Sequence, residues 1–232
     1  MRTDSSVNEL ETLVIKAVKT STKGFRPFTV CLSGGVDSSM LVALLTKIGM
    51  KPALTVTMAN SEEHPDYKAA KLVADIFDLK WQPIILKQPV EIVDGQSRLH
   101  VIDGDDAVFT LYSHLAKLEV KNVLCTDGID ELTGGYIGHR AEQDFAHYLG
   151  RLWSCHVEPL LASAQHRGIR LRFPYLDYRL TDFITRLPIE LKTNGDNRKV
   201  IWRRLALRYL PEEIIYRRKY GQCSMLNWKP EH

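Results

Sequence analysis

The stretch FTVCLSGGVDSSMLVALL, residues 28–45, decides the fold. It begins as an apolar run typical of a buried strand, breaks off at a serine, two glycines and an aspartate, and resumes with apolar residues at helical spacing. We expect a strand over 28–32 and a helix from Asp37 to about Ile48, joined by a polar loop. A strand that runs directly into a helix is the first half of a βαβ unit.

The chain up to residue 125 repeats this alternation. Strands are predicted over 53–58, 82–86 and 122–125, with helices over 65–78 and 105–120. Regular alternation predicts right-handed βαβ units, so the fold class is α/β with a doubly wound parallel sheet.

An amphipathic helix over 7–20 precedes the first strand. We therefore divide the chain into an N-terminal helix, residues 1–24, and one domain, residues 25–232. The strand patterns stop after residue 140, so we expect the part from about residue 141 to be helical.

Composition points to a globular protein of the cytoplasm. The chain has 232 residues, of which 44% are hydrophobic and 25% charged, and no apolar run approaches the ~20 residues that cross a bilayer. Its start carries acidic residues and lacks the apolar region of a secretory signal. The four cysteines show no CxxC pair or metal-ligand spacing, so we expect reduced thiols. Because no apolar run is long enough to cross a bilayer, we expect no membrane partner.

Charge is distributed unevenly along the chain. Acidic side chains exceed basic ones up to residue 150, and basic side chains exceed acidic ones after it. A basic C-terminal part suits a polyanion such as a nucleoside triphosphate or RNA, and it equally suits a solvated helix face.

The polar loop after the first strand has the features of a phosphate site. Ligands of doubly wound sheets sit at the carboxyl ends of the strands. Gly34 and Gly35 let backbone N–H groups approach an anion, and the helix that begins near Asp37 presents unpaired N–H groups. The loop lacks the lysine of a Walker sequence, so it is a different phosphate loop. Further hydroxyl donors are Ser33, Ser38 and Ser39.

The pattern S-G-G-x-D-S resembles that of the PP-loop ATP pyrophosphatase superfamily, and three later blocks resemble the synthetase domain of class B asparagine synthetases. These blocks are VLCTDGIDELTGGY (123–136), RFPYLDYRL (172–180) and LPEEIIYRRKYG (210–221). They occur in the family's order, and the resemblance covers roughly residues 25–225.

The resemblance implies roles for particular residues. It implies a sheet of the PP-loop type that binds ATP and Mg²⁺, with the metal between Asp37 and Asp130 and with Thr57 or Met58 against adenine. Lys199 and Lys219 would reach the phosphates, and Lys219 would offset the charge of the leaving pyrophosphate. The nucleotide-binding loops would comprise Ser33, Gly34, Gly35, Asp37, Ser38, Ser39 and Gly128.

The resemblance also implies an AMP-forming, ATP-dependent ligase. A carboxylate would attack the α-phosphorus, pyrophosphate would leave, and ammonia or an amine would then displace AMP from the acyl-adenylate. Such chemistry depends on positioning and charge stabilisation more than on covalent catalysis.

One departure from the family concerns the source of nitrogen. Class B asparagine synthetases begin with a glutaminase domain whose nucleophilic cysteine follows the initiator methionine, whereas residue 2 is Arg2 here. We therefore expect nitrogen from free ammonia, from an amine, or from a separate glutaminase or carrier partner. The sequence also leaves open whether the chain forms a homodimer.

Other departures concern the substrate end of the site. Asp127 replaces a family glutamate, which sets its carboxylate about 1.5 Å further back but leaves it able to act as a general base that contacts the substrate. Acidic residues stand where asparagine synthetases hold aspartate with an arginine, so we infer that free aspartate is not the substrate. The alternative is that these acids cap the helix N-terminus. They are Asp103, Asp105 and Asp106.

Two other functions are considered. A PP-loop enzyme that modifies RNA would use the basic C-terminal part, but such enzymes lack the three asparagine-synthetase blocks, so we expect no nucleic acid partner. A non-catalytic nucleotide-binding subunit is disfavoured because Asp37, Asp130 and Lys219 are all present, although Asp127 leaves it open.

Overall fold

The computed structural model describes residues 2–86 and 105–220. Its centre is a sheet of five parallel strands in the order β3-β2-β1-β4-β5, which confirms the predicted doubly wound α/β class. The strands are β1 (Thr29–Cys31), β2 (Leu54–Ala59), β3 (Trp81–Ile85), β4 (Asn122–Leu124) and β5 (Arg170–Arg172).

The chain enters the sheet in the middle, moves outward to β3, and returns on the other side of β1. In the register, Val30 of β1 lies beside Leu124 of β4. The loops after β1 and β4 therefore leave the same edge of the sheet side by side, at the point where the strand order reverses. Ligands of open α/β sheets bind at such a point.

The prediction that strands end after residue 140 is wrong, because β5 pairs with β4 at the edge of the sheet. Only three residues long, β5 is too short for an alternation pattern, and Arg170 and Arg172 occupy its first and last positions. Their guanidinium groups lie over the ring of Phe25, with Arg172 4.3 Å from the ring centre, while Leu171 packs on the opposite face. The two arginines are held by cation–π contacts with an aromatic ring, so this strand lacks the alternating apolar residues by which a strand is recognised in a sequence.

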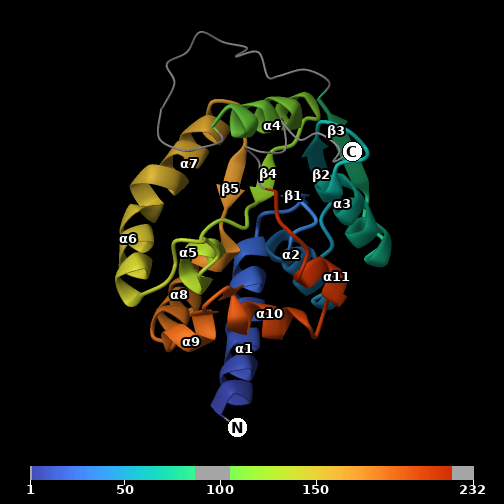
Figure 1. The fold of residues 1–232 in the computed structure, drawn as a ribbon. Helices are drawn as coiled ribbons and strands as arrows, with labels where there is room; N and C mark the ends of the chain where they lie inside the picture. Colours follow the sequence, from blue (N-terminus) through green and yellow to red (C-terminus); the bar gives the residue numbers. More distant parts are fainter. Residues whose placement is uncertain (1, 87–104, 221–232) are drawn as a thin grey trace.

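Helices cover both faces of the sheet (Figure 1). One face packs against α1 (Arg2–Thr22), α2 (Val36–Lys47) and α3 (Pro65–Ile76), and the other against α4 (Asp105–Lys117) and α7 (Glu158–Gln165). Because successive strand residues point to opposite faces, Val30 and Leu32 join the first core while Cys31 packs on the second.

The N-terminal helix α1 belongs to the first of these cores. Leu10, Val14 and Val18 are fully buried, in one cluster with residues of α2 and with Trp202. Among the described helices, none is long and apolar enough to cross a membrane.

The C-terminal part is mainly helical, as predicted from about residue 141. Its helices include a five-residue π-helix, η1 (Trp153–Val157), inserted between α6 (Glu142–Leu152) and α7. The remaining elements are α5 (Ile129–Thr133), η2 (Pro174–Leu176), α8 (Tyr178–Thr185), α9 (Ile189–Lys192), β6 (Thr193–Asn194), β7 (Asn197–Arg198), α10 (Val200–Ala206) and α11 (Glu212–Ile215).

Candidate functional site

The loop between β1 and α2 is shaped by its two glycines in different ways. Gly34 has a φ of +68°, and a Cβ there would lie 2.4 Å from the backbone nitrogen of Ala70 in α3. Gly35 has an extended conformation with φ −78°, and a Cβ there would meet only the Ser33 hydroxyl, at 3.4 Å. Gly34 is therefore required by packing within the chain, whereas Gly35 keeps a side of the loop open.

The start of α2 has no side-chain cap. Its N-cap is Gly35, which has no side chain that could accept a hydrogen bond from the first N–H groups of the helix. The Ser33 and Ser38 hydroxyls lie 3.0 Å apart, and Ser38 Oγ also accepts from the Ser33 backbone N–H at 3.1 Å. The loop therefore presents backbone and hydroxyl donors together, as the sequence predicts for a phosphate site.

Two carboxylates and two lysines meet beside this loop. Lys199 Nζ lies 2.6 Å from Asp37 Oδ2 and 2.5 Å from Asp130 Oδ1, and Lys219 Nζ lies 2.9 Å from Asp130 Oδ2. Asp37 comes from α2, Asp130 from α5, Lys199 from the residue before α10 and Lys219 from the C-terminal tail. The tertiary structure thus brings together these four side chains, to which the resemblance assigned contacts with phosphates and metal.

The four charges stabilise one another. Burial alone would raise the pKa of Asp130, but the charges of Lys199 and Lys219 outweigh it and hold that pKa well below its usual range. The Asp130 charge in turn raises the pKa of Lys219. Lys199 is buried and adopts a left-handed φ of +56°, a conformation that costs free energy in a non-glycine residue. This cost at a charged, buried position is typical of a functional site.

The cluster offers limited ligation for a metal ion. Within the described residues, no three His, Cys, Asp or Glu side chains are arranged to hold one. Two carboxylates are nevertheless what proteins commonly give Mg²⁺ when phosphate oxygens and water complete its shell. Asp37 and Asp130 therefore fit an ion that arrives with a phosphorylated ligand.

Arg217 fastens the C-terminal tail to the phosphate loop, and the sequence analysis missed it. Its Nε donates to the Gly34 carbonyl at 2.8 Å, and its Nη2 donates to the Ser33 carbonyl at 3.0 Å and to Asp66 at the start of α3. This fork positions the tail that carries Lys219. The one signal in the sequence is its place two residues before Lys219 in the block LPEEIIYRRKYG.

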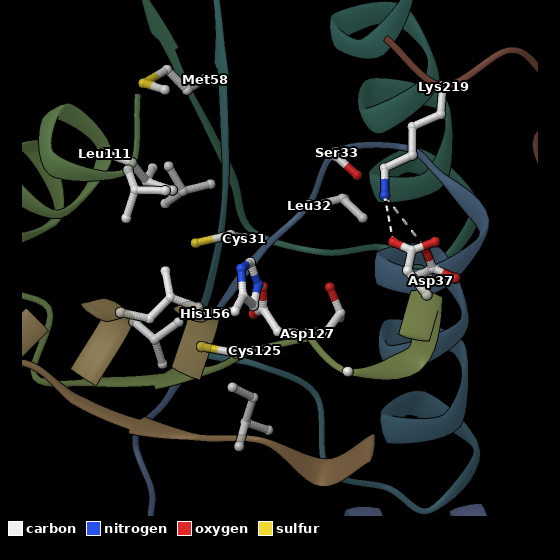
Figure 2. A pocket seen from close by; sticks show the side chains of 18 of the residues that line it. Cys31, Leu32, Ser33, Asp37, Met58, Leu111, Cys125, Asp127, His156 and Lys219 are labelled. Atoms are coloured by element: carbon white, nitrogen blue, oxygen red, sulfur yellow. Dashed lines mark hydrogen bonds and ion pairs between the residues drawn. The ribbon is translucent and has the colours of Figure 1, made fainter. Parts of the chain in front are cut away.

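A cavity of about 270 Å³ runs from the charge cluster to the face of the sheet covered by α4 and α7 (Figure 2). At one end it is lined by Ser33, Asp37 and Lys219. Away from this end lie Cys31, Cys125, Asp127 and His156, and the wall on that side also includes apolar residues, with Met58, Val108, Leu111 and Leu160. We call these the phosphate end and the histidine end.

His156 defines the histidine end, and the sequence analysis did not assign it a role. Its Nε2 lies 2.8 Å from Asp127 Oδ1, and about a quarter of each side chain is exposed, 26% for His156 and 30% for Asp127. Burial would lower the pKa of His156, but the hydrogen bond and charge of Asp127, with the charges of Glu131 and Asp130, raise it instead. No spacing pattern in the sequence marks this histidine, which lies in the π-helix η1.

The glycine that follows Asp127 packs tightly against Leu176 of η2. Gly128 has a φ of +93°, and a Cβ there would lie 2.1 Å from a methyl carbon of Leu176. The sequence assigned Gly128 to nucleotide binding, and the structure places it on the cavity wall. Its packing role is independent of any ligand.

Of the remaining residues predicted for the site, the structure places some on the cavity wall and others elsewhere. Met58 lines the cavity, but the Thr57 hydroxyl donates to the Leu32 carbonyl at 2.6 Å and accepts from Trp81 at 2.7 Å, so Thr57 is committed to the core. The Ser39 hydroxyl is buried within α2 with no hydrogen-bond partner among the described residues and is not part of the cavity wall. Asp103 and the side chains of Asp105 and Asp106 lie outside the described residues.

The thiols of Cys31 and Cys125 at the histidine end are in their protonated, unreactive form. Burial, together with the charge of Asp127, raises the pKa of Cys31 to about 12, and burial raises that of Cys125 well above its ordinary value. Both are free thiols: Cys31 ends β1, and Cys125 directly follows the neighbouring strand β4. At neutral pH they form an uncharged floor for the cavity.

A parallel doubly wound sheet with a phosphate-type loop and acidic residues at its switch point defines a nucleotide-binding α/β protein. Comparison of sequences specifies the family. The family model described as asparagine synthase matches residues 9–167 and 161–231, and the chain belongs to that family.

Individual relatives are glutamine-hydrolysing asparagine synthetases. The Gallus gallus enzyme is 27% identical over 235 residues and the Homo sapiens enzyme 27% identical over 245 residues, and each match covers 91% of this chain and 42% of the relative. A probable asparagine synthetase of Acanthamoeba polyphaga mimivirus is 25% identical over 261 residues, covering 97% of this chain and 46% of the relative. The chain thus spans less than half the length of these curated relatives.

Two solved structures are also similar to this chain, each with a TM-score of 0.41. They are an NMN synthetase from Francisella tularensis, 15% identical and covering 97% of this chain and 99% of that one, and an NH3-dependent NAD synthetase from Campylobacter jejuni, 17% identical and covering 79% and 92%.

Proposed function

We propose that this chain is an ATP-dependent ligase that activates a carboxylate as an acyl-adenylate, releases pyrophosphate and transfers the acyl group to ammonia or an amine. The observation that carries the proposal is the meeting of Asp37, Asp130, Lys199 and Lys219 beside the loop of Gly34 and Gly35. Membership of the asparagine synthase family supports it and favours it over an RNA-modifying enzyme.

The phosphate end suits the β- and γ-phosphates of ATP. Backbone N–H groups at the start of α2 and the Ser33 and Ser38 hydroxyls would bind phosphate oxygens. Lys199 and Lys219 would then exchange their carboxylate partners for the charge that develops on the leaving pyrophosphate. Such preorganised charge stabilisation is worth about 3–4 kcal/mol per donor in comparable enzymes.

Asp37 and Asp130 would hold Mg²⁺ against these phosphates. When bound, the ion would neutralise negative charge on the phosphates and orient them. The binding of a dication between the two carboxylates would also free both lysines for the anion.

In this proposal the reacting carboxylate would lie between the two ends of the cavity. Met58 and the apolar wall would contact the adenine ring, and Asp127, which lines the same cavity, would lie near the acyl group. The inference that free aspartate is excluded concerns residues outside the described part of the chain and stays a prediction, as do a partner that supplies ammonia, a homodimer and a cytoplasmic location.

The test is exchange of labelled pyrophosphate into ATP across a panel of the twenty standard amino acids and simple dicarboxylic acids, with the nucleotide product identified. We expect at least one acid to support exchange and to yield AMP with ammonium present. Lys219→Ala should slow exchange at least about a hundred-fold, whereas Lys51→Ala, at an exposed ion pair with Asp78, should not. Formation of ADP alone, or exchange with none of the acids, would overturn the proposal.

A further inference from the structure

The pair formed by His156 and Asp127 has no role in adenylation as described above. It lies away from the phosphate-binding residues, where Figure 2 shows both side chains beside the sulfur atoms of Cys31 and Cys125. A histidine paired with a carboxylate in a partly enclosed cavity is the arrangement of a general base with its orienting acid.

The hydrogen bond fixes where the histidine can accept a proton. An ionised carboxylate only accepts hydrogen bonds, so the 2.8 Å contact between Nε2 and Asp127 Oδ1 places a proton on Nε2. The neutral ring then carries its lone pair on Nδ1. Within the part of the chain that the structure describes, no group is hydrogen-bonded to Nδ1 of His156.

We propose that His156 is the general base of the amidation step, with Nδ1 as its proton acceptor and Asp127 as the residue that positions it. This rests on the proposed ligase function and changes the role of Asp127 from base to orienting acid. The free-base amine attacks the acyl carbon, the C–N bond forms, and the C–O bond to AMP breaks with its electron pair passing to the phosphate oxygen. The surplus N–H proton goes to Nδ1, which leaves an imidazolium paired with Asp127.

The surroundings favour this proton transfer. Asp127, Asp130 and Glu131 are the acids whose charges stabilise the imidazolium. The other ionisable groups of the cavity wall are the thiols of Cys31 and Cys125, the phenols of Tyr112 and Tyr136, and Asp37, Asp66 and Lys219 towards the phosphate end. From α7 the wall receives Leu160, which is apolar. A negative environment raises the basicity of His156, and the neutral thiols add no competing base at neutral pH.

The amine substrate is constrained by the same geometry. Its nitrogen must lie between the acyl carbon and a ring that shares the cavity wall with Cys31, Cys125 and Leu160. This partly apolar surrounding suits ammonia or a small primary amine more than a polycation.

The experiment compares His156→Gln with His166→Gln, a matched control at an exposed residue that ends α7. The probe is the acid that supports the fastest exchange in the panel, with ammonia held at a constant free-base concentration. His156→Gln should keep pyrophosphate exchange within about threefold and lose at least a hundred-fold in amide formation, in line with the usual contribution of a general base.

The pH profile separates catalysis from a structural role. A raised pKa means that the ring is protonated, and inactive as a base, until the pH rises through a value above 6.5. Wild-type amide formation should therefore rise with pH through that value, and His156→Gln should lack the rise. Asp127→Asn should move the rise to lower pH with a lower plateau, because the imidazolium loses its counter-ion. Hydroxylamine, a stronger nucleophile that needs less base assistance, should restore acyl transfer to His156→Gln.

The outcomes are distinguishable. Absence of exchange in the wild-type chain with every acid overturns the ligase function and with it the role of His156. Normal exchange with an unchanged ratio of amide formation to exchange in His156→Gln overturns the role of His156 alone. Equal loss of exchange, amide and hydroxamate formation in His156→Gln also overturns it, since it identifies a structural contribution.

Discussion

The two ends of the cavity differ in how they are built. The phosphate end rests on a continuous loop, Ser33 to Ser38, whose donors are mostly backbone groups and nearby hydroxyls. The histidine end is a meeting of side chains from β1, from the loop after β4 and from the π-helix η1. The first can be read from a short motif, and the second exists only when distant elements are packed. The predictions below test whether the ends also differ in function.

The largest effect is expected from the carboxylates of the phosphate end. Asp37→Asn and Asp130→Asn should each reduce pyrophosphate exchange by a hundred- to a thousand-fold, roughly the loss seen when preorganised charge at a transition state is removed. Each change also leaves Lys199 with one carboxylate instead of two, so denaturant unfolding should show destabilisation by up to about 3–5 kcal/mol. Asp75→Asn, at an exposed ion pair, is the control. Normal exchange in both variants would show that neither carboxylate takes part in the reaction at the phosphate end.

Substitution of the two loop glycines should separate an effect on folding from an effect on ATP binding. Gly34→Ala combines a left-handed φ with a contact of 2.4 Å to the α3 backbone, so it should destabilise the fold by about 3 kcal/mol. Gly49→Ala has a similar φ of +71° with nothing within 4 Å and should lose about 1 kcal/mol. Gly35→Ala should fold normally and bind ATP weakly, as measured by calorimetry. Equal thermal stability of all three variants would show that α3 does not constrain the loop.

Thiol reactivity tests the histidine end. Because the pKa of Cys31 is raised to about 12 and hydrogen bonds from Arg151 and Ser154 lower that of Cys155, iodoacetamide at neutral pH should label Cys155 at least about a hundred-fold faster. Since the thiolate is the reactive form, labelling of Cys31 should increase with pH. Peptide mass spectrometry measures both rates. Equal rates at neutral pH would mean that the cavity floor is open to water and charged.

The smallest effect concerns the link between the tail and the loop. Arg217→Lys keeps the charge but loses the fork that bonds the Ser33 and Gly34 carbonyls, so the KM for ATP should rise about tenfold with little change in the fold. Arg186→Lys, on the exposed end of α8, is the matched control. An unchanged KM for ATP in Arg217→Lys would show that Lys219 is positioned without this clamp.

The sequence by itself determined the alternation of strands and helices, the parallel sheet and the glycine-bearing loop after the first strand. Each of these depends on residues that are neighbours in the chain, so periodicity and local conformational preference are sufficient to identify them. The resemblance to asparagine synthetases added Asp130, Lys199 and Lys219. In the structure both lysines lie within hydrogen-bonding distance of Asp130, and Lys199 also lies within that distance of Asp37.

Only the tertiary structure decided the edge strand β5, the commitment of Thr57 to the core, the clamp of Arg217 and the pair of His156 with Asp127. In each case the deciding partner is far away in sequence: Phe25 lies under the arginines of β5, Trp81 bonds Thr57, and 29 positions separate Asp127 from His156. A side chain's chemistry is set by what surrounds it in space, and a linear pattern carries that information only when the neighbours in space are also neighbours in the chain.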